Sequence, residues 1–380
     1  MNMQKEKYMI AVLPGDGIGP ELVEEGIKVL ESVQEVTTGL NLSFTKYEIG
    51  SDLYRRTGVV CPPEVFDACR DMDAIYKGPI GLPDVTYPDG TEPAVDILLR
   101  FGLDLYANIR PVKLRPGVST ILRDKKVGDI DYVVVRENTE GLYASWSGDI
   151  AKTKTARAGG IILRDELATD TLIITRKGTE RIVRYACELA RKRNGAPIDG
   201  KKRVTCVDKS NVIKSYAFFR KIFDEVASEY LDINRDYAYV DAMAQWMIRS
   251  PELFDVIVVE NMFGDIITDL GSATVGSIGM GPSANIGENH GMFEPIHGSA
   301  PKYAGKGIAN PIGQILSGRM MLEWLGDRYS DDKLKLAAAK IEDAVTATLS
   351  EGKCLTPDLG GKSKTNEVGN AIVKKIREMS

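Results

Sequence analysis

The chain has 380 residues, of which 43% are hydrophobic and 27% charged, so a largely disordered protein is excluded and two or more domains are expected. Its net charge of -5 argues against nucleic acid or an anionic membrane as a partner. Five cysteines without CxxC spacing indicate reduced thiols in a cytoplasmic protein and exclude a disulfide framework. We expect neither a secretory segment nor a membrane span, because no apolar stretch reaches about 18 residues.

Short apolar runs alternate with helical patterns, which is typical of βα units around a largely parallel sheet. Residues 9–13 predict a buried strand, and the apolar positions between Leu22 and Val33 predict a helix with one buried face. A second helix is expected over 178–193, and the polar stretch 150–170 is predicted to be a protruding arm or loop. Further strands are expected at 132–135, 171–175, 203–207, 237–240 and 256–259.

Charged residues follow four of these predicted strands directly or after a short turn. Open α/β sheets bind ligands beyond the carboxyl ends of their strands, so this pattern favours a polar active-site cleft. The residues concerned are Arg136, Lys209, Asp241, Asp265 and Asp269.

Asp265 and Asp269 stand four residues apart, which places both carboxylates on one helical face. The alternative is a solvated acidic helix start. Mg²⁺ and Mn²⁺ prefer such hard oxygen ligands, and a chain with only two histidines offers few other donors. We therefore predict a metal site here, with Asp241 as the third donor.

Arg100, Arg110 and Arg136 would bind a substrate with at least two carboxylates if they shared a cleft, because guanidinium groups bind carboxylates bidentately. Taken singly, each is as well explained as a surface charge or a structural ion pair. Lys209 and Tyr143 could exchange protons if buried near a cation.

The segment GDGIG (15–19) resembles a dinucleotide fingerprint at first sight. The third glycine of GxGxxG would fall on Pro20, so we reject a Rossmann assignment. Anion binding at a helix N-terminus and a simple tight turn remain equal alternatives for these glycines.

Taken together, the motifs resemble those of the β-decarboxylating dehydrogenases, the family of isocitrate, 3-isopropylmalate, homoisocitrate, tartrate and D-malate dehydrogenases. The resemblance covers nearly the whole chain in order. It is carried by GDGIGPE (15–21), DLYANIRP (104–111), VRENTEGLY (135–143), KSN (209–211), NMFGDIITDLG (261–271), EPIHGSA (294–300), GKGIANP (305–311) and TPDLGG (356–361).

This resemblance implies an α/β, non-Rossmann fold of the isocitrate/isopropylmalate dehydrogenase type, with two domains and an active-site cleft between them. Residues 1–104 and 276–380 are expected to form the larger, cofactor-binding domain, and 105–275 the smaller one. The smaller domain should form a homodimer contact and lend Lys209 and Asp241 to the partner's site.

The resemblance also implies residue roles. Asp265, Asp269 and Asp241 of the partner subunit would bind Mg²⁺ or Mn²⁺, Lys209 would accept the hydroxyl proton, and Tyr143 would protonate the enol. Substrate contacts are expected from Arg100, Arg110, Arg136, Asp96, Ile97 and Asn211. NAD or NADP is expected at His297, Gly298, Ser299, Ala300, Lys302, Tyr303, Asn310 and Asp358.

Substrate choice in this family depends on the stretch PDGTEPAVDILLR (88–100). Asp96 would repel the third carboxylate of isocitrate, and with Ile97 it offers only half of the apolar surface that covers an isopropyl group. Homoisocitrate enzymes have an arginine near Ile97 that is missing here. D-malate or a tartrate is therefore the expected substrate, with 3-isopropylmalate, then isocitrate or homoisocitrate, as alternatives.

For the cofactor, Lys302 and Tyr303 look like the pair that binds the 2′-phosphate in NADP-using isocitrate enzymes. Ala309 and residues 357–361 look like the NAD users, and Lys302 could be a solvated loop residue. We expect both cofactors to work, with a modest preference for NADP.

Two other classes were weighed. A carbohydrate or phosphate binding protein would not need the three aspartates, and a Mg²⁺-dependent phosphoryl-transfer enzyme of the P-loop type would need a GxxxxGK[ST] loop, which the sequence lacks.

Overall fold

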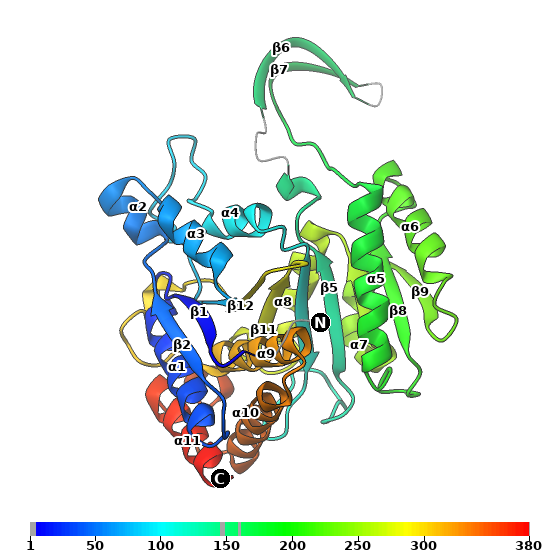
Figure 1. Cartoon of the computed structure of the whole chain (residues 1–380). Helices are drawn as coiled ribbons and strands as arrows, with labels where there is room; N and C mark the ends of the chain where they lie inside the picture. Colours follow the sequence, from blue (N-terminus) through cyan, green and yellow to red (C-terminus); the bar gives the residue numbers. More distant parts are fainter. Residues whose placement is uncertain (1–4, 145–148, 159–160, 380) are drawn as a thin grey trace.

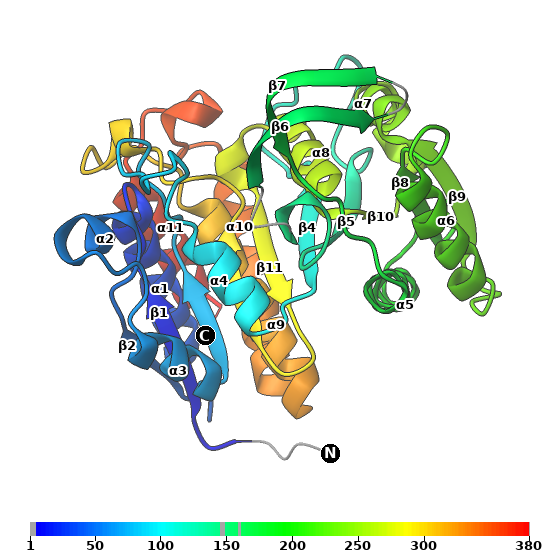
Figure 2. The same ribbon diagram turned by 90° about the horizontal axis from the view of Figure 1, so that it is seen from above.

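The computed structural model describes residues 5–144, 149–158 and 161–379. Its centre is a ten-stranded mixed sheet in the order β2-β1-β3-β12-β11-β4-β5-β10-β8-β9 (Figures 1 and 2). The strands are β1 (Tyr8–Leu13), β2 (Leu42–Lys46), β3 (Ala74–Lys77), β4 (Ala107–Lys113), β5 (Asp131–Glu137), β8 (Arg203–Asp208), β9 (Asn234–Tyr239), β10 (Val256–Val259), β11 (Pro282–Ile286) and β12 (Gly291–Pro295).

Helices cover both faces of this sheet, as expected for a largely parallel sheet. No helix in these described ranges is both long and apolar enough to span a bilayer. The helices are α1 (Gly19–Glu35), α2 (Ser51–Thr57), α3 (Pro63–Asp71), α4 (Val95–Gly102), α5 (Arg176–Lys192), α6 (Lys214–Ala227), α7 (Val240–Arg249), α8 (Asn261–Ala273), α9 (Ile312–Tyr329), α10 (Asp332–Glu351) and α11 (Thr365–Arg377).

The first βα unit forms as the sequence predicts. The apolar residues of β1 are buried, and α1 buries the expected face from Leu22 to Val33. Gly17 has a φ of 59°, and a Cβ there would lie 2.1 Å from the carbonyl oxygen of Ser299. Because only glycine tolerates both conditions, this turn is a structural link to the loop after β12.

The strand order follows the division that the sequence predicts. Strands from the first and last parts of the chain make one half of the sheet, and strands from 105–275 make the other half. The halves meet at the antiparallel pair β4 and β11. One sheet and one hydrophobic cluster run through both halves, so the boundary between two domains stays a prediction.

In the second half, β5, β10, β8 and β9 are mutually parallel. Their carboxyl ends therefore lie along one edge, as expected from the charged residues that follow them. Alternation along β5 directs Val133 and Val135 into the cluster beneath α5 and Tyr132 and Val134 into the cluster beneath α8. Figure 2 shows these two helices on opposite sides of β5.

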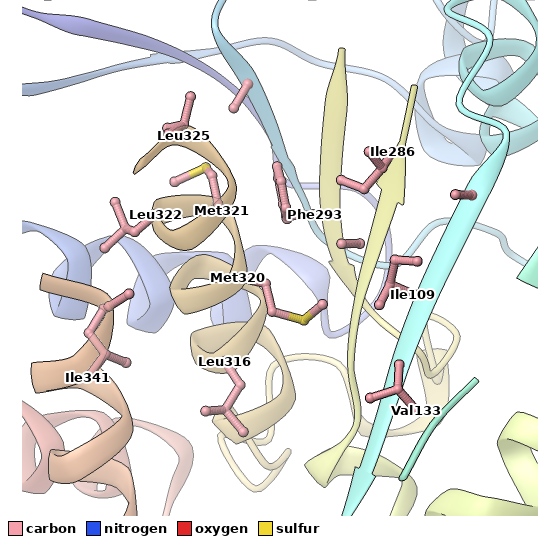
Figure 3. Packing of buried hydrophobic residues seen from close by; sticks show 14 of the residues in the cluster. Ile109, Val133, Ile286, Phe293, Leu316, Met320, Met321, Leu322, Leu325 and Ile341 are labelled. Carbon is pink, nitrogen blue, oxygen red and sulfur yellow. The ribbon is translucent and has the colours of Figure 1, made fainter. Parts of the chain in front are cut away.

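The core of the other half lies between α9 and the sheet. Figure 3 shows Leu316 and Met320 of α9 on one side of this core, with Phe293, Ile286 and Ile109 on the strands β12, β11 and β4 on the other. All five side chains are buried. This packing fixes β11 and β4, the two central strands of the sheet. The strands whose carboxyl ends carry the charged residues follow directly after β4 in the sheet.

Two predicted strands need correction. Residues 171–175 form no strand beyond a single bridge between Ile173 and Gly141, because Thr175 instead caps α5 by accepting a hydrogen bond from the backbone N–H of Gly178. The strand expected at 237–240 is β9, which ends at Tyr239, and Val240 begins α7.

The predicted arm is a two-stranded ribbon. Strands β6 (Asp149–Ala158) and β7 (Ile161–Thr169) pair with each other in antiparallel register. In Figure 1 the ribbon stands away from the main sheet. Its strand character was missed because the segment has no clear apolar alternation.

Candidate active site

Asp265 is the centre of a buried charged cluster at the carboxyl end of β5. It pairs with Nη1 of Arg136 and lies 3.4 Å from Nη1 of Arg110, while the hydroxyl of Tyr143 donates to its Oδ2 at 3.1 Å. Asp269, one turn further along α8, lies 3.7 Å from the same nitrogen of Arg110. Four of the predicted site residues therefore come together around Asp265.

Burial and charge act in opposite directions on these groups. Burial alone would raise the pKa of Asp265, but the guanidinium groups of Arg136, Arg110 and Arg100 hold that pKa below its usual range. Burial raises the pKa of Asp269, because nearby guanidinium groups offset burial less for this carboxylate than for Asp265. Burial, with Asp265 close by, also raises the pKa of the Tyr143 phenol, so this group carries its proton at neutral pH.

A second cluster joins Asp96 to a residue that sequence reasoning missed. Lys77, fully buried at the end of β3, has its Nζ 2.8 Å from Oδ1 of Asp96 and 2.5 Å from Oε2 of Glu294. Arg100 binds the other oxygen of Glu294 at 3.2 Å. A lysine ending an apolar strand before a glycine is the only signal that the sequence offered.

This contact changes the interpretation of Asp96. The sequence alone suggests an uncompensated negative charge facing the substrate, but Lys77 neutralises it. Burial would raise the pKa of Glu294, yet Lys77 and Arg100 lower it to about 2, so this carboxylate is also charged and paired. Repulsion by Asp96 is therefore a weaker argument against isocitrate than the sequence suggested.

The two clusters together are electrically balanced. Four cationic side chains face four carboxylates, so the site has no net charge before a ligand binds. A divalent cation and a dicarboxylate would add charges that cancel. The cations are Lys77, Arg100, Arg110 and Arg136, and the carboxylates are Asp96, Asp265, Asp269 and Glu294.

Lys209 and Asp241 lie apart from these clusters. Lys209 follows β8, Asp241 is in the first turn of α7 after β9, and their side chains form an ion pair of 2.6 Å. Asp265 is on the helix after β10, whereas Lys209 follows β8 and Asp241 follows β9, the edge strand of the sheet. Within the described residues, no group of three His, Cys, Asp or Glu side chains is arranged to hold a metal.

The predicted cofactor residues gather on the loops after β12. His297 is buried, its Nδ1 lies 3.0 Å from the carbonyl oxygen of Gly298, and its Nε2 has no hydrogen-bond partner among the described residues. Asn310 donates to Asp358 at 3.0 Å. Burial lowers the pKa of His297, which leaves a neutral ring with a free acceptor facing this loop.

Other predicted cofactor residues have identifiable local contacts. Ser299 accepts a backbone hydrogen bond from Ile18 and donates its hydroxyl proton to Gly81, so it joins three loops. Ala300 has a positive φ of 39°. The ammonium of Lys302 lies 4.8 Å from the ring centre of Tyr303, and both side chains are exposed.

Asn211 and Ile97 do not contact the charged clusters through any recorded hydrogen bond. Asn211 is exposed, two residues after Lys209, and Ile97 is partly exposed on α4 beside Asp96. A cavity of about 640 Å³ lies between α5 and α9, where it is lined by Val133 and Phe293 among other residues, and it extends to Arg110.

The chain belongs to the isocitrate/isopropylmalate dehydrogenase family, whose sequence profile matches residues 9–372. It is therefore a β-decarboxylating dehydrogenase, and its mixed α/β fold is the fold of that family. The chain is 44% identical over 98% of its length to a 3-isopropylmalate/3-methylmalate dehydrogenase of Methanocaldococcus jannaschii, covering 99% of it. It is 40% identical over 97% of its length to a tartrate dehydrogenase/decarboxylase of Pseudomonas putida, covering 98% of it.

A solved structure gives the same result. The chain matches isocitrate dehydrogenase from Methylococcus capsulatus with a TM-score of 0.83 and 36% identity, covering 97% of this chain and 99% of that one. Three relatives whose names carry different substrates are thus similar to this chain over nearly their full length. The family is settled, whereas the substrate is not.

Proposed function

We propose that this enzyme catalyses the divalent-metal- and NAD(P)-dependent oxidative decarboxylation of a (2R)-malate-type dicarboxylic hydroxy acid, with D-malate or a tartrate as substrate. The observation that carries this proposal is the cluster of Arg100, Arg110 and Arg136 around Asp265. Buried guanidinium groups that bind carboxylates bidentately suit a substrate with two carboxylates. We also propose a cytoplasmic enzyme that acts without nucleic-acid or membrane partners.

Asp265 and Asp269 suit Mg²⁺ or Mn²⁺. Both are hard oxygen donors one helical turn apart, and both side chains retain access to solvent. A cation bound there polarises the substrate's 2-hydroxyl and carboxylate when present. Binding it would draw Asp265 away from Arg110 and Arg136, and both guanidinium groups would then be available to the substrate.

The third metal donor is proposed to be Asp241 of the partner subunit. Apolar side chains are exposed beside both halves of the site, as expected for surfaces that meet a second copy. Ile266, next to Asp265, is 61% exposed, Val212, near Lys209, is 72% exposed, and Trp246 of α7 is 46% exposed. A homodimer that buries these residues would bring Lys209 and Asp241 of one subunit to Asp265 of the other.

The proposed proton steps use two side chains. Lys209 of the partner subunit accepts the proton of the 2-hydroxyl as the hydride leaves from the same carbon. Carbon dioxide then departs, and the electron pair of the broken C–C bond forms the C2=C3 double bond of an enolate, whose negative charge is on the C2 oxygen. Tyr143, which holds its phenolic proton, supplies the proton to C3.

NAD(P) accepts the hydride when bound. The free acceptor at Nε2 of His297 and the Asn310–Asp358 pair suit the adenine end of a dinucleotide. Lys302, stacked with Tyr303, would favour the 2′-phosphate of NADP, and we keep the modest preference for NADP.

Ile97 is the observation that bears on the size of the substrate. It follows Asp96 on α4 and is partly exposed, and an ion-paired Asp96 is a poor surface for an isopropyl group. D-malate and a tartrate therefore remain the substrates that we propose first. 3-Isopropylmalate is the second candidate, because the relative with 44% identity carries that substrate in its name.

The test is a substrate panel with both cofactors. Reduced nicotinamide absorbance is followed with Mn²⁺ and D-malate, L- and meso-tartrate, 3-isopropylmalate or isocitrate. We expect the highest kcat/KM on D-malate or a tartrate, a lower value on 3-isopropylmalate and little turnover of isocitrate. Isocitrate as the best substrate would refute the proposed specificity. A strong NAD preference that is unchanged in Lys302→Asp would refute the role of Lys302.

A further inference from the structure

Glu137 is a buried carboxylate directly after the site residue Arg136. Its side chain is 2% exposed. Arg136 faces α8, where it contacts Asn261 and Asp265, so the alternation of β5 places Glu137 on the opposite face, toward α5. The side chain of Glu137 therefore lies on the face of β5 opposite Asp265, and it cannot serve as a substrate contact.

Both carboxylate oxygens of Glu137 hold the turn that leads to Tyr143. Oε1 accepts hydrogen bonds from the backbone N–H of Thr139 at 2.9 Å and from its hydroxyl at 2.8 Å. Oε2 accepts the backbone N–H of Glu140 at 2.6 Å. All three groups are donors here, so the charged carboxylate satisfies them and a protonated one would lose at least one of these bonds.

The same turn continues into the catalytic end of the site. The side-chain amide of Asn261 donates to the carbonyl oxygen of Glu140 at 2.9 Å, and Gly141 bridges to Ile173. Tyr143 follows on a short 3₁₀ turn and reaches Asp265 at 3.1 Å. A change in the turn at Glu140 would therefore move the phenol relative to Asp265.

The charges that face Glu137 come from three elements. On its own turn, Glu140 adds a negative charge. From α5, Arg181 donates to the hydroxyl of Thr139 at 2.7 Å, but its charge is shared with Asp104 at 2.7 Å. The phenols of Tyr106 and Tyr185 also lie in this region.

Among the residues that the structure describes, no cationic side chain forms an ion pair with the Glu137 carboxylate. Burial therefore dominates and raises the pKa of Glu137 to about 7, even though the hydrogen bonds from Thr139 and Glu140 lower it. Its charge state changes within the pH range in which a cytoplasmic enzyme works.

We propose that Glu137 is a positioning residue for the proton donor Tyr143, whose turn it holds in place when charged and loosens when protonated. This inference rests on the proposed role of Tyr143. It adds a carboxylate outside the substrate site. The protonation of this carboxylate determines how kcat falls on the acid side of the pH profile.

The test compares Glu137→Gln with wild type by full kinetics from pH 5.5 to 8.5. We expect kcat at pH 8 to fall about tenfold with KM changed less than about twofold, because substrate contacts stay intact while the phenol is misplaced. The acid limb near pH 7 should disappear in the variant. Glu229→Gln is the matched control, since Glu229 is exposed and pairs only with Arg184 across α5 and α6.

A double variant with Tyr143→Phe separates positioning from general damage. If Glu137 acts through Tyr143, Glu137→Gln should have no further effect on kcat in the Tyr143→Phe background. A fully additive loss, or an acid limb that persists in Glu137→Gln, would overturn the proposal.

Hydrogen–deuterium exchange of the segment 138–144 supplies a readout that needs no substrate. In wild type, protection should be higher at pH 8 than at pH 6 after correction for intrinsic exchange, and in Glu137→Gln it should not depend on pH. Equal protection in both proteins would overturn the role of Glu137. Failure of every malate derivative in the substrate panel would instead overturn the proposed function.

Discussion

Two charged regions at the same edge of the sheet differ in how far one chain completes them. Around Asp265, the guanidinium groups of Arg136 and Arg110 are buried, at 1% and 7% exposed, and both pair with Asp265. The pair of Lys209 and Asp241 is open to solvent, with the Asp241 side chain 66% exposed. Both regions were predicted from charged residues that follow parallel strands.

The difference shows that the same sequence pattern, a charged residue after a parallel strand, can produce either a cluster around buried cations or an ion pair that is open to solvent. A buried ion pair is held in place because breaking it leaves a charge without water, whereas an exposed pair exchanges partners at little cost. We therefore propose that substrate binds beside the buried guanidinium groups and that the exposed pair meets a second subunit.

The largest effect is expected from Asp265→Asn. This change removes the charge that two guanidinium groups and the proposed cation share, so turnover should fall on the order of a thousandfold or more. The substitution keeps the size of the side chain, and circular dichroism should show an intact fold. Full activity in excess chelator would contradict the proposed metal dependence.

Lys77→Met should cost stability, because it leaves Asp96 and Glu294 without their buried partner. Removing one member of a buried ion pair typically costs about 3–5 kcal/mol, and urea unfolding at pH 7 measures it. A loss below about 1 kcal/mol would show that Arg100 alone compensates Glu294.

Acid should weaken the fold through Glu294. Its pKa in the folded chain is about 2, below the usual 4.5, so the unfolded chain takes up the proton first. The stabilisation is complete above pH 4.5 and is lost as pH falls toward 2; about 3 kcal/mol is at stake. Unfolding free energies between pH 3 and 6 should fall more steeply in wild type than in Glu294→Gln.

Shared sites can be tested by co-expressing Lys209→Met with Asp265→Asn, each inactive alone. In a mixed dimer one site would have both intact residues, so random pairing should restore about a quarter of wild-type turnover. Absence of any recovery from mixed dimers, with both chains present in the purified protein, would show that each site is built from one chain.

The smallest effect is expected from the stability of Asp241→Asn. Its carboxylate is exposed and pairs only with Lys209 in the described part of the chain, so the urea midpoint should match wild type. Activity should nevertheless be lost. A clear shift in the midpoint would mean that this pair stabilises the single chain.

Much of the fold follows from local pattern. Alternation and helical periodicity located β1, α1, β5, β8, β10 and α5, because buried faces repeat along the chain. The strand expected at 171–175 was wrong because Thr175 binds the helix backbone instead. The antiparallel strands β4 and β11 gave no comparable signal, since Asn108, Arg110 and Pro111 in β4 and Ser283 and Asn285 in β11 interrupt the apolar pattern.

The same limit applies to the site. The charged residues after the strands were enough to predict a polar cleft, and the set of motifs along nearly the whole chain was enough to predict the family. Lys77 was missed because its partners, Asp96 and Glu294, are 19 and 217 residues away in the numbering. Only folding could show that Asp96 is neutralised.

The sequence by itself determined the family, the edge of the sheet that carries the chemistry, and the residue types that perform it. These depend on local alternation, spacing and side-chain chemistry. The tertiary structure alone decided which charges are compensated, that Lys209 and Asp241 lie away from Asp265, and that Glu137 binds the turn at Thr139 and Glu140. Those properties depend on distances between segments and on burial, which set the strength of every electrostatic contact.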